Sequence, residues 1–316
     1  MTDTENRGRE CITVNSKLTI GLALGSGSAR GWSHIGIIKE LASLGVVPNI
    51  VCGTSVGSLV GASYVSNNID KLEEWACSLT KFEAAKFFDI NLSLNGFINI
   101  EKFHGFLNEY VADDETLIED YPKQYAAIAT ELATGREIWL AKGSIVEAVW
   151  ASISMPSLFP AIKLNNKWLV DGGLVNPVPV SVCRALGADI VIAVNLNGDI
   201  MGRQRRANAE VVKHDNNGVT GKLTELVREY SGSFFANANI SDQPPGLLEA
   251  IAHSINITQD RITRSRMAGD PADIVLSPRL ADIGLLEVYR ANEAIEEGRR
   301  CVQRMASEIT DRLEEI

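Results

Sequence analysis

The sequence predicts an α/β fold in which helices cover both faces of a mainly parallel sheet. Short apolar runs that suit buried strands alternate with helical patterns along most of the 316 residues. Three of these runs lead directly into turns that are rich in glycine. Because ligand sites of open α/β sheets lie at the carboxyl ends of strands, we expect these turns to converge on one edge.

Seven apolar runs have the length and composition of strands. They span residues 17–24, 49–52, 124–130, 137–141, 167–170, 190–195 and 273–276. A turn at Thr134-Gly135-Arg136 joins the third run to the fourth. Helical patterns separate the others, and the clearest lie at residues 32–44, 71–78, 144–154, 179–186, 247–266 and 285–313.

The composition is that of a globular protein whose core needs no disulfide or metal. Hydrophobic residues make up 45% of the chain and charged residues 22%, which suits one large domain or two modest ones. The five cysteines are odd in number and have no C-x-x-C spacing, as is typical of reduced cytosolic thiols without a zinc site. The sequence has no calcium-loop spacing, so we expect calcium independence.

The charge and hydropathy patterns predict a soluble, cytoplasmic protein. A formal net charge of −10 argues against a general nucleic-acid binder, which would need a basic surface. Residues 1–10 are polar, so we expect no signal peptide, and no run of 18 apolar residues could cross a membrane. Residues 197–221 carry basic side chains among Asn and Gly, and predict either a solvated loop or contact with an anionic surface.

The motif Gly53-Thr54-Ser55-Val56-Gly57 lies between a predicted strand and a predicted helix, which is the context of a nucleophile elbow. Such a turn holds a serine out of the sheet, where its hydroxyl can reach a carbonyl carbon. Gly53 and Gly57 suit it because the turn leaves no room for Cβ atoms and can need a positive φ. The alternative is a helix start in which Ser55 is only a cap.

Asp171 is a candidate base for this serine, because no histidine is placed like the late histidine of an α/β-hydrolase. It follows a predicted strand, and Gly172 and Gly173 after it would leave its carboxylate uncovered. The alternative is an ordinary D-G-G turn. We expect His34, four residues after Arg30, to pack and to hydrogen-bond within its helix or loop.

The loop Gly25-Ser26-Gly27-Ser28-Ala29-Arg30-Gly31 is a candidate oxyanion hole. It leads from a strand to a helix N-terminus, where free amides and the helix dipole favour an anion. Each such donor lowers a barrier by roughly 2.7–4 kcal/mol. A nucleotide phosphate loop is the rival interpretation, but neither the P-loop nor the G-x-G-x-x-G spacing is present. Arg30 could brace the loop or attract a phosphate-bearing substrate.

Together these segments resemble the patatin-like phospholipase family, above all its bacterial members. The family carries a G-G-G-x-x-R-G-type loop followed by His and Gly, then G-T-S-x-G, and later D-G-G/A followed by Asn and Pro. The matching positions are 25–31, His34, Gly36, 53–57, 129–132, Gly135, 151–160, 171–173, Asn176 and Pro177. Order and spacing agree from about residue 18 to residue 196.

The resemblance implies a three-layer patatin-like fold and a Ser55–Asp171 dyad that works without histidine. Ser55 would attack the acyl carbonyl, Asp171 would act as general base, and the amides of the 25–31 loop would hold the oxyanion. No cofactor is expected. Ser26 and Ser28 stand where the family often has glycine, which leaves the acyl-chain preference open.

The resemblance also implies one hydrolase domain at 17–316, after a flexible N-terminus at 1–16. Its core would span 18–196, a variable surface region 197–246, and a closing helix–strand–helix unit 247–316. The implied substrate is a phospholipid or lysophospholipid, with peripheral membrane contact as a possibility. The alternatives are a general carboxylesterase or thioesterase, and a weakly active regulatory protein on the same fold.

Overall fold

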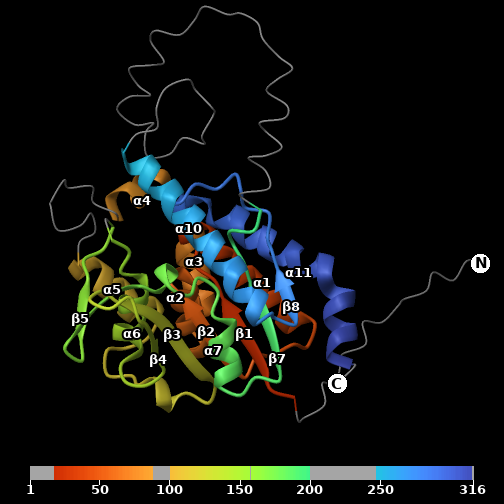
Figure 1. Cartoon of the computed structure of the whole chain (residues 1–316). Coiled ribbons are helices and arrows are strands. Elements are labelled where there is room, and N and C mark those ends of the chain that lie inside the picture. The colour runs from red at the N-terminus through yellow and green to blue at the C-terminus, as the bar shows by residue number, and fades with distance from the viewer. Residues whose placement is uncertain (1–17, 88–99, 157, 200–246, 315–316) are drawn as a thin grey trace, which may run out of the picture.

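A central sheet organises the chain, which a computed structural model describes at residues 18–87, 100–156, 158–199 and 247–314 (Figure 1). Its strands are β1 (Ile20–Leu24), β2 (Ile50–Thr54), β3 (Gln124–Glu131), β4 (Glu137–Leu140), β5 (Ile162–Leu164), β6 (Lys167–Asp171), β7 (Ile190–Val194) and β8 (Ile274–Leu276). The order across the sheet is β5-β6-β3-β2-β1-β7-β8, and β4 pairs with β3 outside this path. The expected flexible N-terminus and most of the expected variable surface region lie outside the described residues.

The sheet is mainly parallel, as the sequence predicts. β3, β2, β1, β7 and β8 run in one direction. β4 and β6 pair antiparallel with β3, and β5 pairs antiparallel with β6. The sequence prediction lacks β5, which reaches β6 through Asn165 and Asn166 at φ 49° and 61°. Two such residues are typical of a type I′ hairpin, so the asparagine pair was the available signal.

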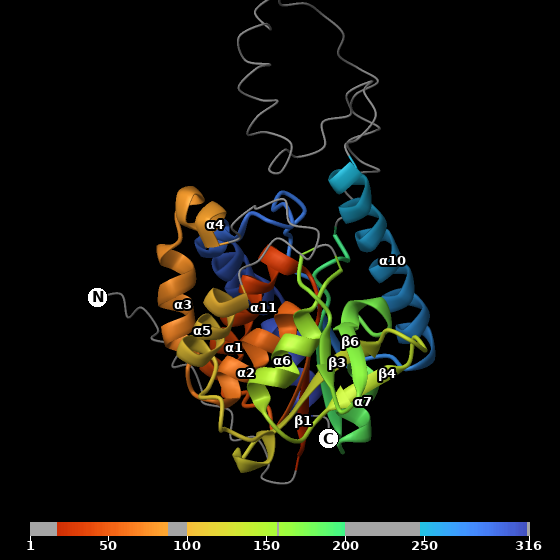
Figure 2. The same cartoon turned by 90° about the vertical axis from the view of Figure 1, so that its left-hand side faces the viewer.

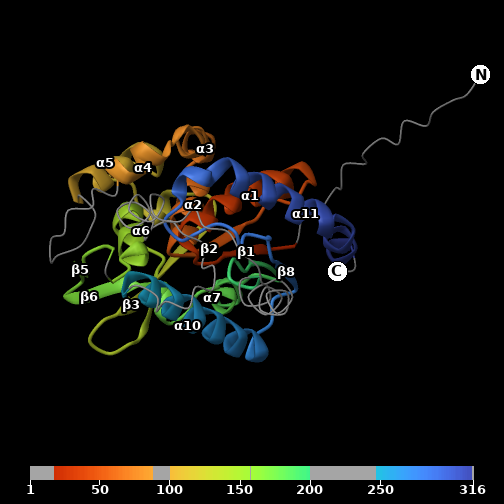
Figure 3. The same ribbon diagram turned by 90° about the horizontal axis from the view of Figure 1, so that it is seen from above.

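Helices cover both faces of the sheet, which confirms the predicted three-layer α/β/α fold (Figure 3). The helices are α1 (Ser33–Ser43), α2 (Val56–Val65), α3 (Ile69–Ser78), α4 (Lys81–Phe87), α5 (Ile100–Tyr110), α6 (Ile145–Ile153), α7 (Val180–Ala185), α10 (Leu247–Gly269) and α11 (Ala291–Glu314). The 3-10 turns are η1 (Ser28–Trp32), η2 (Ile118–Asp120), η3 (Gly172–Leu174) and η5 (Val288–Arg290). Helices α7 and α10 lie side by side on one face, opposite α1, α2 and α11 (Figure 2, Figure 3).

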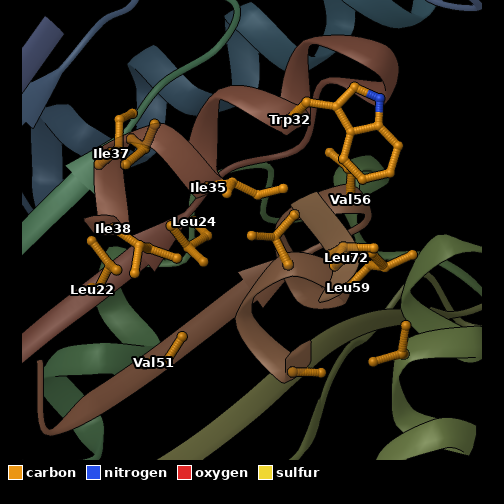
Figure 4. Packing of buried hydrophobic residues seen from close by; sticks show 14 of the residues in the cluster. Leu22, Leu24, Trp32, Ile35, Ile37, Ile38, Val51, Val56, Leu59 and Leu72 are labelled. Carbon is orange, nitrogen blue, oxygen red and sulfur yellow. The ribbon is translucent and has the colours of Figure 1, made fainter. Parts of the chain in front are cut away.

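The middle strands are apolar along their whole length because helices cover them on both sides. Every residue of β1 and β7 is buried. Leu22 and Leu24 of β1 point into the layer that holds α1 and α2, where Ile35 and Leu59 contribute to the same core (Figure 4). Ala23 points to the opposite layer. Polar chemistry is therefore left to the ends of these strands.

The C-terminal helix begins later than the sequence predicts. Its expected start was residue 285, whereas α11 begins at Ala291. Residues 288–290 form the 3-10 turn η5, and the Glu287 carboxylate accepts a hydrogen bond from the Gly284 amide at 2.8 Å. This local bond holds the chain in a turn where the apolar period alone suggests a helix.

Candidate active site

Ser55 lies in a strained turn between β2 and α2. Its backbone has φ 56° and ψ −126°, a region that residues with a side chain rarely adopt. The Ser55 amide donates to Oγ of Ser152 at 2.9 Å, and that hydroxyl donates to the Ile128 carbonyl at 2.6 Å. Hydrogen bonds from α6 and β3 thus stabilise the turn. The strain falls on the serine itself, since neither Gly53 nor Gly57 has a positive φ.

The two glycines of the elbow are required by close approach. A Cβ on Gly57 would overlap the carbonyl oxygen of Leu24, and one on Gly53 would overlap the carbonyl oxygen of Gly57. Both obstacles are backbone atoms, which cannot move without disturbing β1 or α2. The sequence suggested two reasons for glycine at these positions. The lack of room for a Cβ atom is confirmed, whereas neither glycine has the positive φ that was the other reason.

Asp171 contacts Ser55 directly. Its Oδ2 accepts from Oγ of Ser55 at 2.6 Å, and its Oδ1 accepts from the Gly173 amide at 2.6 Å. Only 1% of Asp171 and 3% of Ser55 is exposed. Burial raises the pKa of Asp171 to about 6, although the hydrogen bonds from Ser55 and Gly173 lower it. The carboxylate is therefore ionised at neutral pH and able to accept a proton.

Asp171 reaches the site by a different route from the one that the sequence suggested. It is the last residue of β6, which runs antiparallel to β3 and pairs Asp171 with Ala129. Ser55, in contrast, follows the carboxyl end of the parallel strand β2. The two side chains meet at one edge of the sheet, as expected. The expected reason was wrong, because Asp171 does not follow the carboxyl end of a strand parallel to β2.

The turn after Asp171 is fixed by crowding and by hydrogen bonds. A Cβ on Gly172 would overlap the Ile128 carbonyl oxygen, and one on Gly173 would overlap the amide nitrogen of Gln259. The Thr130 hydroxyl donates to the Asp171 carbonyl at 2.8 Å. The sequence pointed to the two glycines but gave no signal for Gln259, which lies far along the chain.

Most amides of the 25–31 loop are engaged in other hydrogen bonds. Within the described chain, the backbone N–H groups of Gly27 and Ser28 have no acceptor, and Ser28 lines the same cavity as Ser55. Of the seven amides expected to form an oxyanion hole, these two are therefore the candidate free donors, and the amide of Gly31 lies inside the 3-10 turn η1. That the loop binds an oxyanion stays a prediction. The engaged pairs are Gly25 with Val194 (3.1 Å), Ser26 with Pro177 (2.9 Å), Ala29 with Leu285 (3.1 Å) and Arg30 with Gly27 (3.3 Å).

Later segments of the chain hold the two serines of this loop. The Ser26 hydroxyl donates to Oε1 of Gln259 at 3.0 Å, and the Ser28 hydroxyl donates to the Leu285 carbonyl at 2.6 Å. Ser28 has φ 51°, a conformation that favours glycine. Compared with the glycine that the family often has at this position, Ser28 therefore adds backbone strain but also adds a hydrogen bond to the Leu285 carbonyl.

Arg30 and His34 support the loop from inside the protein. Arg30 is buried, and it donates to the Gly27 carbonyl at 3.2 Å and to Oδ1 of Asn256 at 2.9 Å. Of the two roles expected for Arg30, the structure therefore shows the one in which it braces the loop.

Nε2 of His34 donates to the Gly25 carbonyl at 2.8 Å, and burial lowers the pKa of His34 to about 4. His34 is thus a neutral packing residue, as expected. Gly31 packs against Val56, beside the elbow.

An apolar cavity lies beside Ser55. Apart from Ser28 and Ser55 its lining is apolar. It comes from η1, α2 and the turn before it, α3, α5, α6 and the segment after it, and η5. A small number of polar groups at one end of an apolar pocket suits a ligand with a long hydrocarbon part. Sequence patterns did not single out its aromatic walls, since helical spacing does not separate core from cavity. These include Trp32, Trp75, Phe103, Phe106 and Phe159.

The described residues contain neither a metal-binding cluster nor a membrane-spanning helix. No group of three or more His, Cys, Asp or Glu side chains among them could hold a metal ion. None of the described helices has both the length and the apolar character needed to cross a bilayer.

Comparisons with known proteins show which family the chain resembles. Residues 22–184, more than half of the chain, match the family described as patatin-like phospholipase. An uncharacterized NTE family protein of Mycobacterium bovis is 29% identical over an alignment 337 positions long, which covers 91% of each chain. Patatin-like phospholipase domain-containing protein 6 of Homo sapiens is 31% identical over 185 residues, which cover 56% of this chain and 13% of that protein. Among solved structures, VipD from Legionella pneumophila matches 93% of this chain and 77% of its own, with a TM-score of 0.34 and 12% identity.

Proposed function

The chain belongs to the patatin-like phospholipase family, and from this premise we propose that it hydrolyses lipid acyl esters with Ser55 as nucleophile and Asp171 as general base. Family membership supports a lipid hydrolase. The observation that carries the finer proposal is the 2.6 Å hydrogen bond from Oγ of Ser55 to Oδ2 of Asp171. A nucleophile within hydrogen-bond reach of a base, at the wall of a cavity that can admit the ester, is the arrangement that acyl transfer needs.

In the first half of the proposed reaction the acyl group moves to the enzyme. Oγ of Ser55 attacks the carbonyl carbon of the ester while its proton passes to Oδ2 of Asp171. The carbonyl oxygen becomes negative, and the free amides of Gly27 and Ser28 are the donors available to stabilise it. When the ester bond breaks, the proton on Asp171 passes to the leaving alkoxide, and an acyl-enzyme remains.

Water releases the acyl group in the second half. Asp171 accepts a proton from a water molecule as the water oxygen attacks the acyl-enzyme carbonyl. Collapse of that intermediate returns the proton to Oγ of Ser55 and frees the fatty acid. The raised pKa of Asp171 suits both halves, because a base is most effective when its pKa lies near the working pH.

The cavity supports a lipid as the acyl donor. Its aromatic and aliphatic walls would take a hydrocarbon chain, with the ester carbonyl at the Ser28–Ser55 end. A phospholipid or lysophospholipid fits this description better than a small polar ester. Peripheral contact with a membrane surface and a cytoplasmic location stay predictions.

Labelling by a serine-directed fluorophosphonate tests the proposal, combined with fatty-acid release from a panel of phospholipids and lysophospholipids. We expect both signals from the wild type and neither from Ser55→Ala or Asp171→Asn. Ser63→Ala is the matched control, because Ser63 is likewise a buried serine, within α2, but its hydroxyl donates to the Tyr110 carbonyl. It should label and hydrolyse as the wild type does.

Two outcomes would contradict the proposal. A folded wild type that neither labels nor releases fatty acid would favour a regulatory protein on this fold. Labelling that survives Asp171→Asn at near-full rate would mean that another group activates Ser55. Hydrolysis of short water-soluble esters or thioesters without any action on lipids would keep the dyad but replace the substrate class.

A further inference from the structure

Gln259 is a buried polar residue of α10 that neither the sequence patterns nor the proposed chemistry explains. Only 3% of it is exposed, although an amide side chain loses free energy on burial unless it forms hydrogen bonds. Helix α10 lies on the face of the sheet opposite the elbow helix α2 (Figure 3). A specific set of contacts must therefore offset the burial of this amide.

The oxygen of the Gln259 amide is bound to the oxyanion loop. Oε1 accepts from the Ser26 hydroxyl at 3.0 Å and from Nδ2 of Asn197 at 3.2 Å. An amide oxygen has two lone pairs, so both are used. Ser26 and Gln259 are 233 residues apart in the chain, and this bond is therefore a tertiary link between the loop and α10.

The nitrogen of the same amide lies against the turn of the proposed base. A Cβ placed on Gly173 would overlap Nε2 of Gln259, and the same point lies 2.9 Å from Oδ1 of Asp171. The amide and the carboxylate thus crowd one side of Gly173. Gln259 contacts both parts of the candidate site, the loop with the oxyanion donors and the turn with the base.

A second side chain of α10 holds the loop nearly one helical turn earlier. Oδ1 of Asn256 accepts from Nη2 of Arg30 at 2.9 Å, and Nε of Arg30 donates to the Gly27 carbonyl at 3.2 Å. Residues three apart lie on one face of a helix, so Asn256 and Gln259 act from the same side. The loop is thereby held on both sides of Gly27, whose amide is one of the two free donors.

The other end of α10 is anchored to the sheet. Nη2 of Arg266 contacts Oε2 of Glu137 at 2.6 Å, and Oε1 of Glu137 accepts from Nδ2 of Asn176 at 2.8 Å. Asn176 in turn accepts a hydrogen bond from the Thr54 hydroxyl, next to the nucleophile. Because α10 is bound to the 25–31 loop through Asn256 and Gln259 and to the sheet through Arg266, it can set the position of that loop.

We propose that Gln259 is a positioning residue that sets the oxyanion loop relative to the Asp171 turn. The inference rests on the proposed function, since it matters only if the 25–31 loop stabilises an oxyanion. Oxyanion donors act only when they are aimed at the developing charge, and an error of about 1 Å can lower a rate by about 100-fold. Loss of the Gln259 contacts should therefore slow the chemical step while the acyl cavity, which Gln259 does not line, stays intact.

The main test is Gln259→Leu, which keeps the side-chain size and removes both hydrogen bonds. We expect kcat on a phospholipid that the wild type hydrolyses to fall by about 10-fold to 100-fold, with KM changed by less than about 3-fold. The matched control is Thr263→Val, one turn later on α10. Thr263 is also buried, and its hydroxyl has no partner in the described structure, so this variant should keep the wild-type kcat.

Two more variants separate positioning from loss of stability. Gln259→Glu still accepts from Ser26 but places a carboxylate beside Asp171, which should raise the pKa of Asp171 and move the acid limb of kcat/KM to higher pH. Ser26→Ala breaks the same link from the loop side. If the link is what matters, the double variant Ser26→Ala with Gln259→Leu should be no slower than Gln259→Leu alone.

The outcomes distinguish this inference from the proposed function. If the wild type is inactive and unlabelled, both fail together. If the wild type is active and Gln259→Leu retains its kcat, or loses kcat only in proportion to its folded fraction by thermal melting, the positioning role is wrong and the proposed function stands. An unchanged acid limb in an active, folded Gln259→Glu variant would also overturn it.

Discussion

The two turns that meet in the candidate site hold their residues in different ways. Ser55 has a strained backbone at φ 56°, and its side chain forms one hydrogen bond within the described structure, to Asp171. Asp171 has an ordinary backbone at φ −46° and ψ 132°, and both oxygens of its carboxylate are bound. The position of the serine is thus set by the main chain, whereas the position of the aspartate is set largely by its side-chain partners.

The difference matters for what a substitution does. A main chain held in place by its neighbours keeps its course when the side chain is removed, so the Ser55 turn should survive truncation. A carboxylate that is buried between two donors carries an energetic penalty whenever it is ionised. Substitutions at the two positions should therefore both remove activity but differ in how they change stability.

The largest expected effect is the loss of turnover in either half of the pair. Ser55→Ala and Asp171→Asn should each lower kcat by roughly ten-thousand-fold or more, because residues that act as one unit fail together. The double variant should be no worse than the slower single variant. Steady-state kinetics on the best lipid of the panel would measure this, and additive losses would show that the two residues do not act together.

The second effect concerns pH. The pKa of Asp171 rises from its ordinary value of 3.8 to about 6 on folding, so the folded protein holds this proton more tightly than the unfolded chain. The stability that this proton provides is complete below about pH 4 and is lost as the pH rises through about 6, a loss of about 3 kcal/mol. Asp171→Asn has no such loss, so it should be more stable than the wild type at pH 8 and closest to it at pH 4.

Urea unfolding of the wild type and of Asp171→Asn at pH 4, 6 and 8 would measure the difference in their free energies of unfolding. The kcat/KM profile of the wild type should fall below about pH 6, where Asp171 becomes protonated. If the difference in stability between the two proteins does not depend on pH, burial does not raise the pKa of the Asp171 carboxyl. If kcat/KM of the wild type stays constant down to a pH well below 6, a group other than Asp171 is the base.

The third effect is steric and affects the Asp171 turn. Gly172→Ala would push a Cβ into the Ile128 carbonyl oxygen, and should lower the free energy of unfolding by about 2 kcal/mol or more. Gly105→Ala is the control, because nothing lies within 4 Å of its would-be Cβ in the exposed face of α5. That change should raise stability by up to about 1 kcal/mol. Equal effects at both glycines would show that crowding does not fix the turn.

The smallest effect isolates the strain at Ser55. Glycine adopts a positive φ without a steric penalty, whereas alanine does not, so Ser55→Gly should be about 1 kcal/mol more stable than Ser55→Ala. Both variants lack the nucleophile, and their comparison is therefore free of any effect of the Ser55–Asp171 bond. Equal melting temperatures would mean that the turn relaxes once the hydroxyl is gone.

The sequence predicted the parts of the site that depend on local geometry. The elbow around Ser55 and the D-G-G turn were visible because crowded turns need glycine wherever they occur. The bracing role of Arg30 and the packing role of His34 were also within reach, since Arg30 lies in the loop and His34 follows it in the first helix. In the same way the missed strand β5 had a local signal in Asn165 and Asn166.

Local patterns were enough to predict most strands and helices and the two turns, because apolar period and glycine spacing act over a few residues. Contacts between distant segments were needed to show that β6 runs antiparallel and brings Asp171 to Ser55 from the opposite direction. Long-range packing also leaves the amides of Gly27 and Ser28 without an acceptor among the described residues, and it places Gln259 between the 25–31 loop and the Asp171 turn. These features depend on contacts between segments up to 233 residues apart, and no local pattern encodes which distant groups will compete for one hydrogen bond.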